Sequence, residues 1–252
     1  MSKVYISCDM EGCSGIPNHE FCNPAGKFYA DAQRYMTDDL LAAIQGLQAA
    51  GVEEIVVNDS HWNMTNLRVE QLPLGVSLIS GGTKIDSMVE GLDSSFDAAV
   101  FVGYHSLWGR AKGVLAHTYS GHITQVLVNG VLVGETGLNG LLAGHHGVPV
   151  IHVSGDSQLK EEVAELEAKI GYTVTKEGIT RLASHLYHLE DVHAAITRDV
   201  KAAWDQRASI PPLKTTSPVE IAVRFKETPM ADICQRMPGV RRVDDLTVAY
   251  RH

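Results

Sequence analysis

The sequence has 252 residues, of which 44% are hydrophobic and 20% are charged, a composition typical of folded globular proteins rather than disordered or collagen-like ones. Its 21 Lys and Arg against 30 Asp and Glu leave a net charge of −9, which excludes the basic footprint of a nucleic-acid-binding protein. This length suits one large domain, or one domain with a small appendage.

The first part of the chain alternates between strand-like and helix-like segments. Residues 29–50 have helical character and are followed by Gly51, a residue that commonly ends helices. Continuous apolar runs, typical of strands that are buried on both faces of a parallel sheet, occur at residues 3–8, 54–57, 76–79, 98–104 and 149–153. The alternation predicts an α/β fold with three layers, α/β/α, around a mostly parallel, doubly wound sheet.

The rest of the chain departs from this alternation. Asn129-Gly130 lies between alternating apolar runs and predicts a hairpin over residues 123–134. Helical stretches at 158–170 and 191–206 are followed by a proline-containing linker at 208–218, then by a strand, a short helix and a last strand at 219–225 and 246–250. We therefore predict an α/β metal-binding catalytic domain over residues 1–206. Residues 207–252 form a small α+β subdomain in this prediction, with the hairpin as the candidate link between the two.

The cysteines and the N-terminal residues indicate the cellular compartment of the protein. Four cysteines are too few for a disulfide framework in a chain of this size, so we expect reduced thiols and a cytoplasmic protein. No secretion signal is predicted, because the apolar run after Lys3 stops at Asp9, and no stretch approaches the ~20 apolar residues of a membrane helix. Cys8, Cys13 and Cys22 fit no C-x-x-C zinc motif, so we interpret them as buried thiols.

Side chains of the types that bind metal ions follow several of the predicted strands and the hairpin. In open α/β sheets, ligands bind beyond the carboxyl ends of the strands, so we expect these side chains to meet at one edge. They are Asp9, Glu11, His61, His105 and Glu135.

The chemistry of this set favours a site for two metal ions. Asp9 and Glu11 point to the same side of an extended segment, and without a neighbouring Lys or Arg they repel each other unless a cation lies between them. A single D-x-E after a strand is more often a helix cap or a solvated turn, so the joint pattern is what indicates a metal. Three carboxylates and two histidines can hold two divalent ions if one carboxylate bridges. Mixed oxygen and nitrogen ligands suit zinc, or less tightly manganese or cobalt.

Twelve histidines are an unusual number, since histidine is the commonest metal ligand and the usual proton shuttle near neutral pH. His117 lies in the same region as His105 and is a candidate acid, base or nucleophile. His122 is interpreted as a surface loop residue, with a place in the same pocket as the alternative. Six others are expected at the surface or the core edge, and two are expected in solvent; these are His145, His146, His152, His185, His188 and His193, and then His19 and His252.

Six ordered motifs resemble a known family. The sequence is similar to the zinc-dependent D-aminopeptidases of the dipeptide-transport-operon type, the M55 peptidase family. The resemblance covers residues 3–155 and is weak beyond them. Its motifs are Asp9-Met10-Glu11-Gly12, Asn58-Asp59-Ser60-His61, Met88-Val89-Glu90-Gly91-Leu92, Gly103-Tyr104-His105, His117-Thr118 and Gly134-Glu135-Thr136-Gly137-Leu138-Asn139.

The resemblance implies a metal-dependent aminopeptidase that uses two zinc ions per chain and acts on short peptides or aminoacyl amides, with a preference for D-amino acids. Carried over by motif, Asp9 bridges the two ions, Glu11 and His61 complete the site of one, and His105 and Glu135 complete the site of the other. The family also implies a homo-oligomer, a ring-shaped decamer.

The resemblance assigns His117 as the catalytic nucleophile, whereas the residues alone leave acid–base work equally open. Two other functions stay open. One is another two-metal hydrolase, of a non-peptide amide or a phosphoester; for the phosphoester, the nearest basic residues to hold a phosphate are Arg110 and Lys112, in a loop. The other is a metal-loaded peptide-binding protein without turnover, although binding alone needs no proton shuttle such as His117.

Overall fold

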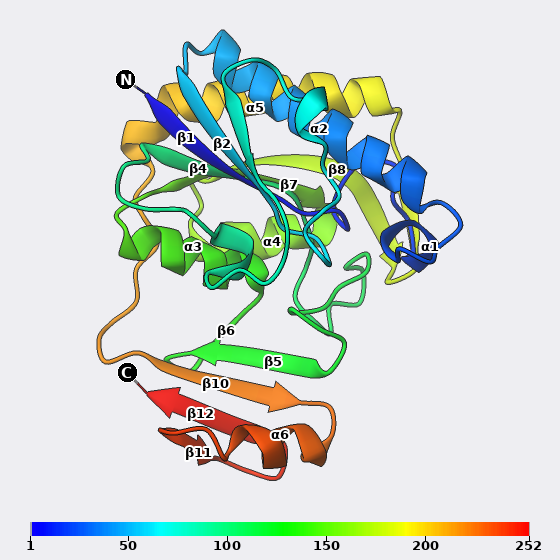
Figure 1. Cartoon of the computed structure of the whole chain (residues 1–252). Helices are drawn as coiled ribbons and strands as arrows, with labels where there is room; N and C mark the ends of the chain where they lie inside the picture. The colour runs from blue at the N-terminus through cyan, green and yellow to red at the C-terminus, as the bar shows by residue number, and fades with distance from the viewer. Residues whose placement is uncertain (1, 252) are drawn as a thin grey trace.

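A computed structural model describes residues 2–251, so His252, expected in solvent, lies outside the described residues. A seven-stranded sheet forms the centre of the larger part of the molecule, in the order β3-β2-β1-β4-β7-β8-β9 (Figure 1). All neighbouring pairs are parallel except β8 with β9. The strands are β1 (Lys3–Cys8), β2 (Glu54–Asp59), β3 (Val76–Ile79), β4 (Ala98–Tyr104), β7 (Val150–Asp156), β8 (Gly171–Thr180) and β9 (Ala183–Leu186).

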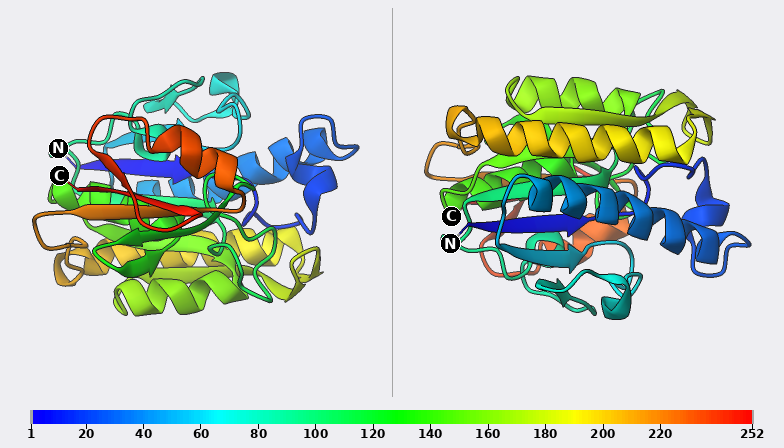
Figure 2. Two further views of the ribbon diagram at one scale, coloured as in Figure 1. Left: turned by 90° about the horizontal axis from the view of Figure 1, so that it is seen from below. Right: turned by 90° about the horizontal axis from the view of Figure 1, so that it is seen from above.

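Helices cover both faces of this sheet. On one face, α2 (Tyr29–Ala49) and α5 (Leu189–Gln206) lie against each other, and on the other face lie α3 (Glu135–His145) and α4 (Ser157–Leu166), as Figures 1 and 2 show. This confirms the predicted three-layer α/β/α architecture with a mostly parallel sheet. The connections contain α1 (His19–Cys22) and the 3-10 turns η1 (Val69–Gln71), η2 (Ser87–Val89) and η3 (Arg207–Ser209). In residues 2–251, no helix has the length and apolarity needed to cross a bilayer.

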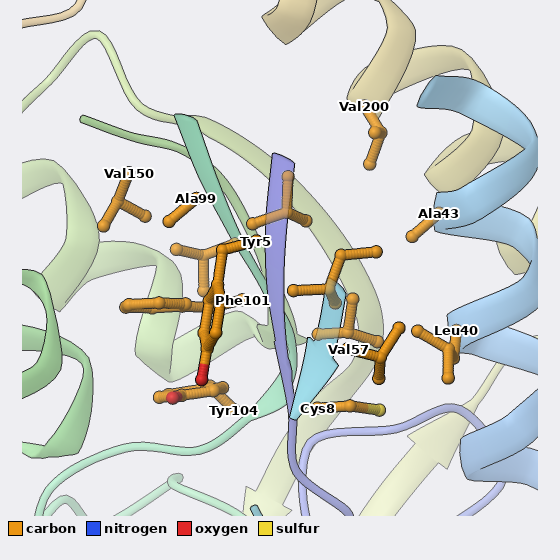
Figure 3. Close-up of a cluster of buried hydrophobic side chains, with 14 of the residues drawn as sticks. Tyr5, Cys8, Leu40, Ala43, Val57, Ala99, Phe101, Tyr104, Val150 and Val200 are labelled. Atoms are coloured by element: carbon orange, nitrogen blue, oxygen red, sulfur yellow. The ribbon is translucent and has the colours of Figure 1, made fainter. Parts of the chain in front are cut away.

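The core explains why the apolar runs become central strands. Every residue of β4 is buried, as a strand between two helical layers requires. Figure 3 shows Leu40 and Ala43 of α2 and Val200 of α5 on one side of the sheet, with aromatic rings on the other. The rings of Phe101 and Tyr104 stack there with centroids 4.7 Å apart. Burying each large apolar side chain contributes about 1.5–3 kcal/mol to folding.

A second, antiparallel sheet lies beyond α3 and α4, in the order β11-β12-β10-β5-β6 (Figure 1, bottom). The predicted hairpin supplies β5 (Ile123–Val128) and β6 (Val131–Val133), and its strand β5 pairs with β10 (Glu220–Phe225). The sheet is completed by β11 (Val240–Arg242) and β12 (Thr247–Arg251), and it carries α6 (Thr228–Cys234). The small α+β part is therefore confirmed, and the domain boundary at residue 206 stays a prediction.

The structure differs from the prediction between residues 167 and 188. The helix expected over 158–170 ends at Leu166, and two strands, β8 and β9, follow where no strand was expected. His185, expected at the surface or the core edge, is exposed on β9. The buried residues of β8 include Thr175 and Lys176, which hydrogen-bond the backbone carbonyl oxygens of the turn that follows β1. Because these polar side chains are satisfied inside the protein, β8 lacks the apolar pattern by which strands are recognised.

Candidate active site

The five predicted ligand residues meet at the carboxyl edge of the main sheet. Asp9 and Glu11 follow β1, His61 follows β2, His105 follows β4, and Glu135 is the first residue of α3. Each of them is at most 7% exposed. The sheet edge thus collects three carboxylates and two imidazoles from four separate segments of the chain.

Asp9 lies between two pairs of side chains. Its Oδ1 is 3.4 Å from Nδ1 of His61, which is also 2.9 Å from Oε2 of Glu11. Its Oδ2 is 3.5 Å from Nε2 of His105, which is also 3.4 Å from Oε2 of Glu135. Asp9 Oδ2 and His105 Nε2 are buried without a hydrogen-bond partner among the described residues. Buried polar atoms without a partner are costly, so this geometry fits a site that a cation completes.

Backbone carbonyl groups orient the imidazole rings. Nε2 of His61 lies 2.9 Å from the carbonyl oxygen of Cys22, and Nδ1 of His105 lies 3.0 Å from that of Ser106. A carbonyl oxygen only accepts, so each of these nitrogens carries the hydrogen, and the opposite nitrogen is turned toward the carboxylates. Metal-bound histidines are commonly oriented in this way by a second hydrogen bond.

The charges of the cluster also call for a cation. Burial, and then the adjacent Glu11 carboxylate, raise the pKa of Asp9 to about 7. Burial alone would lower the pKa of His105, but Glu135 and then Asp9 outweigh it and hold that pKa well above its ordinary value. Without a metal the site therefore tends to hold protons on the Asp9 carboxyl group and on the His105 ring. A divalent cation would displace them, since ligands must be deprotonated to bind.

His117 adjoins this cluster from the loop after β4. Its Nδ1 lies 2.9 Å from the carbonyl oxygen of Leu115, so Nδ1 carries the hydrogen and Nε2 presents a lone pair, 3.8 Å from Oε1 of Glu135. Burial and then the neighbouring His105 lower the pKa of His117. At 22% exposure its side chain is more open to solvent than those of Asp9 and His105, as expected of a group that exchanges protons with a substrate.

A cavity of about 590 Å³ opens onto the cluster. It is lined by Asp9, Glu11, His61, His117 and Glu135, together with residues of the surrounding loops. A larger hollow of about 940 Å³ lies elsewhere, between α2 and the start of α5, and none of the predicted site residues lines it.

The amino-acid sequence matches the peptidase M55 family, D-aminopeptidase, over residues 2–252. It is 34% identical over 237 residues to the D-aminopeptidase of Bacillus subtilis (strain 168), a match that covers 94% of this chain and 86% of that protein. The chain belongs to the M55 peptidase family. The resemblance in the motifs is thereby confirmed, and the match extends well past residue 155, where the motifs alone had become weak.

The fold of this M55 peptidase also matches a solved structure of 33% sequence identity, with a TM-score of 0.96, over 99% of this chain and 91% of that one. That protein is the Zn-dependent D-aminopeptidase DppA from Bacillus subtilis, described as a self-compartmentalizing protease. The likeness includes the second sheet, since nearly the whole chain is covered.

Backbone strain marks the cavity of this M55 peptidase as a functional site. A positive φ is unfavourable for residues other than glycine, and such residues concentrate at functional sites. Six non-glycine residues of the described chain have a positive φ. Five of them line the cavity: Trp62, Met64, Ser87, Leu115 and Tyr119. The sixth, Asn129, is in the hairpin turn.

Asp59, although part of the Asn58-Asp59-Ser60-His61 motif, is a structural residue. Its carboxylate accepts hydrogen bonds from the backbone N–H groups of Asn66 and Leu67 and from the side chain of Asn66. It thereby closes the loop that carries His61. The three cysteines near the site are buried, as predicted, and no cysteine of the described chain belongs to a group that could hold a metal.

The remaining histidines divide between surface, core and cavity. His145 and His146 are exposed, His188 precedes α5, and His122 is exposed while also lining the cavity. His152 is fully buried in β7 and contacts Thr173, so it lies deeper than the core edge where it was expected. His193 lies 3.2 Å from the buried Asp39.

Sequence reasoning missed Arg181. This residue follows β8 and lines the cavity, whereas Arg110 pairs with Glu162. A cation therefore lines the same cavity as the cluster, which makes an anionic group on the substrate acceptable there. No signal in the sequence could have placed it there, because the two strands that flank it were not recognised. His19, expected in solvent, is exposed but also lines the cavity and contacts Arg181.

Proposed function

We propose that this protein is a two-zinc aminopeptidase that removes the N-terminal residue of short peptides or aminoacyl amides, with a preference for D-amino acids. The observation that carries the proposal is the place of Asp9, whose two carboxylate oxygens face two separate histidine–carboxylate pairs. A carboxylate with this arrangement suits a bridge between two metal ions. The family and the zinc dependence of the solved relative support the activity and the metal.

In this proposal Glu11 and His61 would hold one zinc ion, His105 and Glu135 would hold the other, and Asp9 would be shared by both. Tetrahedral zinc takes nitrogen and oxygen ligands, and a catalytic zinc keeps a position open, so this donor set fits the metal. When bound, zinc supplies Lewis acidity toward the scissile carbonyl group.

The chain's own residues supply orientation and proton transfer. The cluster's three acids, Asp9, Glu11 and Glu135, line the cavity, and they attract the free amino group of a peptide, which favours cleavage next to the N-terminus. His117 presents its Nε2 lone pair to the cavity because Leu115 holds the hydrogen on Nδ1. We assign His117 to accept a proton from the water that attacks the carbonyl carbon and to return it to the departing amine.

The test is a hydrolysis screen of matched D- and L-aminoacyl amides and dipeptides, with the purified protein loaded with zinc. The proposal expects hydrolysis at the first peptide bond, faster for the D-compounds. Faster cleavage of L-compounds would overturn the stereochemical part alone. Binding of dipeptides without any hydrolysis would support the peptide-binding function instead, and hydrolysis confined to phosphoesters or non-peptide amides would support another two-metal hydrolase.

We also propose a cytoplasmic homo-oligomer, a ring-shaped decamer, in which enclosure restricts access to short peptides. The support is the description of the solved relative as self-compartmentalizing, together with the coverage of nearly the whole chain by that structure. Sedimentation or light scattering of the purified protein is expected to give the mass of ten chains. A monomer at working concentrations would contradict the assembly without affecting the metal site.

A further inference from the structure

An unpaired arginine shares the cavity with the acidic cluster. Arg181 lies in the turn between β8 and β9 and lines the same cavity as Asp9, Glu11 and Glu135. The three carboxylates are buried, while Arg181 is partly exposed, so the opposite charges lie at different depths. Among residues 2–251, Arg181 forms no ion pair, although it shares the cavity with three carboxylates.

The guanidinium group is nevertheless held in place. Its Nε donates to the carbonyl oxygen of Ala116 at 3.2 Å, and its Nη1 lies 3.1 Å from Nε2 of His19. Burial and then Arg181 itself lower the pKa of His19, so the ring is neutral and can accept this hydrogen bond. The group also lies over the ring of Trp108, 5.6 Å from its centroid. In the described chain Nη2 makes no hydrogen bond, which leaves donors of an oriented cation available to a ligand.

We propose that Arg181 binds the C-terminal carboxylate of a short peptide whose amino end lies at the acidic cluster. This inference rests on the proposed function and names its substrate class: unblocked peptides short enough to reach from the metal ligands to Arg181. A zwitterionic dipeptide presents an ammonium group and a carboxylate at its two ends, which matches the acidic cluster and the arginine. A guanidinium group binds a carboxylate through paired N–H···O hydrogen bonds and through the opposite charge. A C-terminal amide lacks that charge.

The alternative is that Arg181 only holds the loop of His117, through the carbonyl oxygen of Ala116. A structural role of this kind would reduce the turnover of every substrate equally. Carboxylate binding instead changes the KM of substrates that have a free carboxylate, and leaves the KM of their amides unchanged. A pair of substrates that differ only in that group therefore separates the two roles.

The experiment measures kcat and KM of the zinc-loaded protein on D-alanyl-glycine and on D-alanyl-glycinamide. The unsubstituted protein is expected to prefer the free acid. Arg181→Gln is expected to raise the KM for the acid by about 10- to 100-fold, the range of a lost hydrogen bond to a charged group, and to leave the KM for the amide unchanged. Arg181→Lys keeps the positive charge but loses the paired donors of the guanidinium group. Its KM for the acid should therefore lie between those of the unsubstituted protein and Arg181→Gln.

Arg68→Gln is the matched control, since Arg68 is exposed and does not line the cavity, and it should leave both substrates unaffected. The inference would be overturned if Arg181→Gln lost activity equally on the acid and on the amide, or if its KM for the acid were unchanged. If the unsubstituted protein hydrolyses neither compound nor their L-counterparts, the proposed function fails. Calorimetric Kd values of the two compounds for the zinc-loaded protein and for Arg181→Gln then decide the role of Arg181 alone. Weaker binding of the acid by Arg181→Gln than by the unsubstituted protein supports that role. Equal binding of the acid by the two proteins refutes it.

Discussion

The imidazole rings of His105 and His117 stack face to face, with centroids 4.0 Å apart and planes 13° from parallel. Two positively charged rings would repel each other at this separation. His105 faces Asp9 and Glu135 and takes up positive charge from a proton or a metal, so His117 is the ring that stays neutral. The stack thus keeps a lone pair available on His117 at neutral pH.

Replacing His117 should slow catalysis strongly without releasing the metal. His117→Ala removes the proton acceptor but none of the proposed ligands, so we expect kcat to fall by about 100- to 10,000-fold with zinc content unchanged. His145→Ala is a suitable control, because His145 is exposed at the end of α3. Peptide hydrolysis at the normal rate by His117→Ala would show that the assigned role is wrong.

Metal content should respond differently to two neighbouring carboxylates. The ion pair of Glu11 is with His61, whereas Asp9 pairs with both His61 and His105. We therefore expect Glu11→Gln to lose mainly one zinc and Asp9→Asn to lose both, as measured by elemental analysis after dialysis. Glu70→Gln, an exposed acid, serves as the control. The same loss in both site variants would contradict a bridging position for Asp9.

His152 should make the metal-free protein less stable in acid. Burial lowers its pKa from the ordinary 6.5 to about 4 in the folded protein. Between these values the unfolded chain binds a proton that the folded chain does not, so stability falls as the pH drops from about 6.5 to about 4, by up to about 3 kcal/mol. Above pH 6.5 the ring is neutral in both states and has no such effect.

Urea unfolding of the chelator-treated protein and of His152→Gln, at pH 7.5 and pH 4.5, measures this contribution. The variant lacks the ionisable ring, so its free energy of unfolding should decrease less in acid than that of the unsubstituted protein. Identical pH dependence of the two proteins would rule out His152 as a source of acid sensitivity.

Asn129 should stabilise the junction of the hairpin with the C-terminal strands. Its side-chain amide donates to Thr215 and Thr216 and accepts from the backbone N–H of Glu220, and its φ is +49°. Asn129→Ala loses these hydrogen bonds and tolerates the backbone poorly, so we expect a loss of about 1–3 kcal/mol in the free energy of unfolding. Asn129→Gly loses the same hydrogen bonds but accepts the positive φ. The difference in the free energy of unfolding between the two variants therefore measures the backbone strain. Unchanged stability in both would refute this role.

Where local pattern is strong, the sequence by itself determined the structure. The apolar run at residues 98–104 gives a strand with the predicted limits, because a strand buried on both faces must be apolar throughout. The Asn129-Gly130 pair gives a hairpin because both residues accept a positive φ. The five acidic and imidazole ligand candidates were found because each follows a recognisable strand or hairpin, and parallel strands bring such positions to one edge.

Only the tertiary structure decided how these groups face each other. The sequence cannot show that the two oxygens of Asp9 point to different histidines, or that carbonyl groups of distant residues such as Cys22 set the imidazole orientation. It also gave no sign of β8, whose Lys176 and Thr175 are buried against backbone carbonyl groups rather than apolar side chains. Arg181 follows that strand, so its place in the cavity depends on contacts between residues far apart in the chain, which local periodicity does not record.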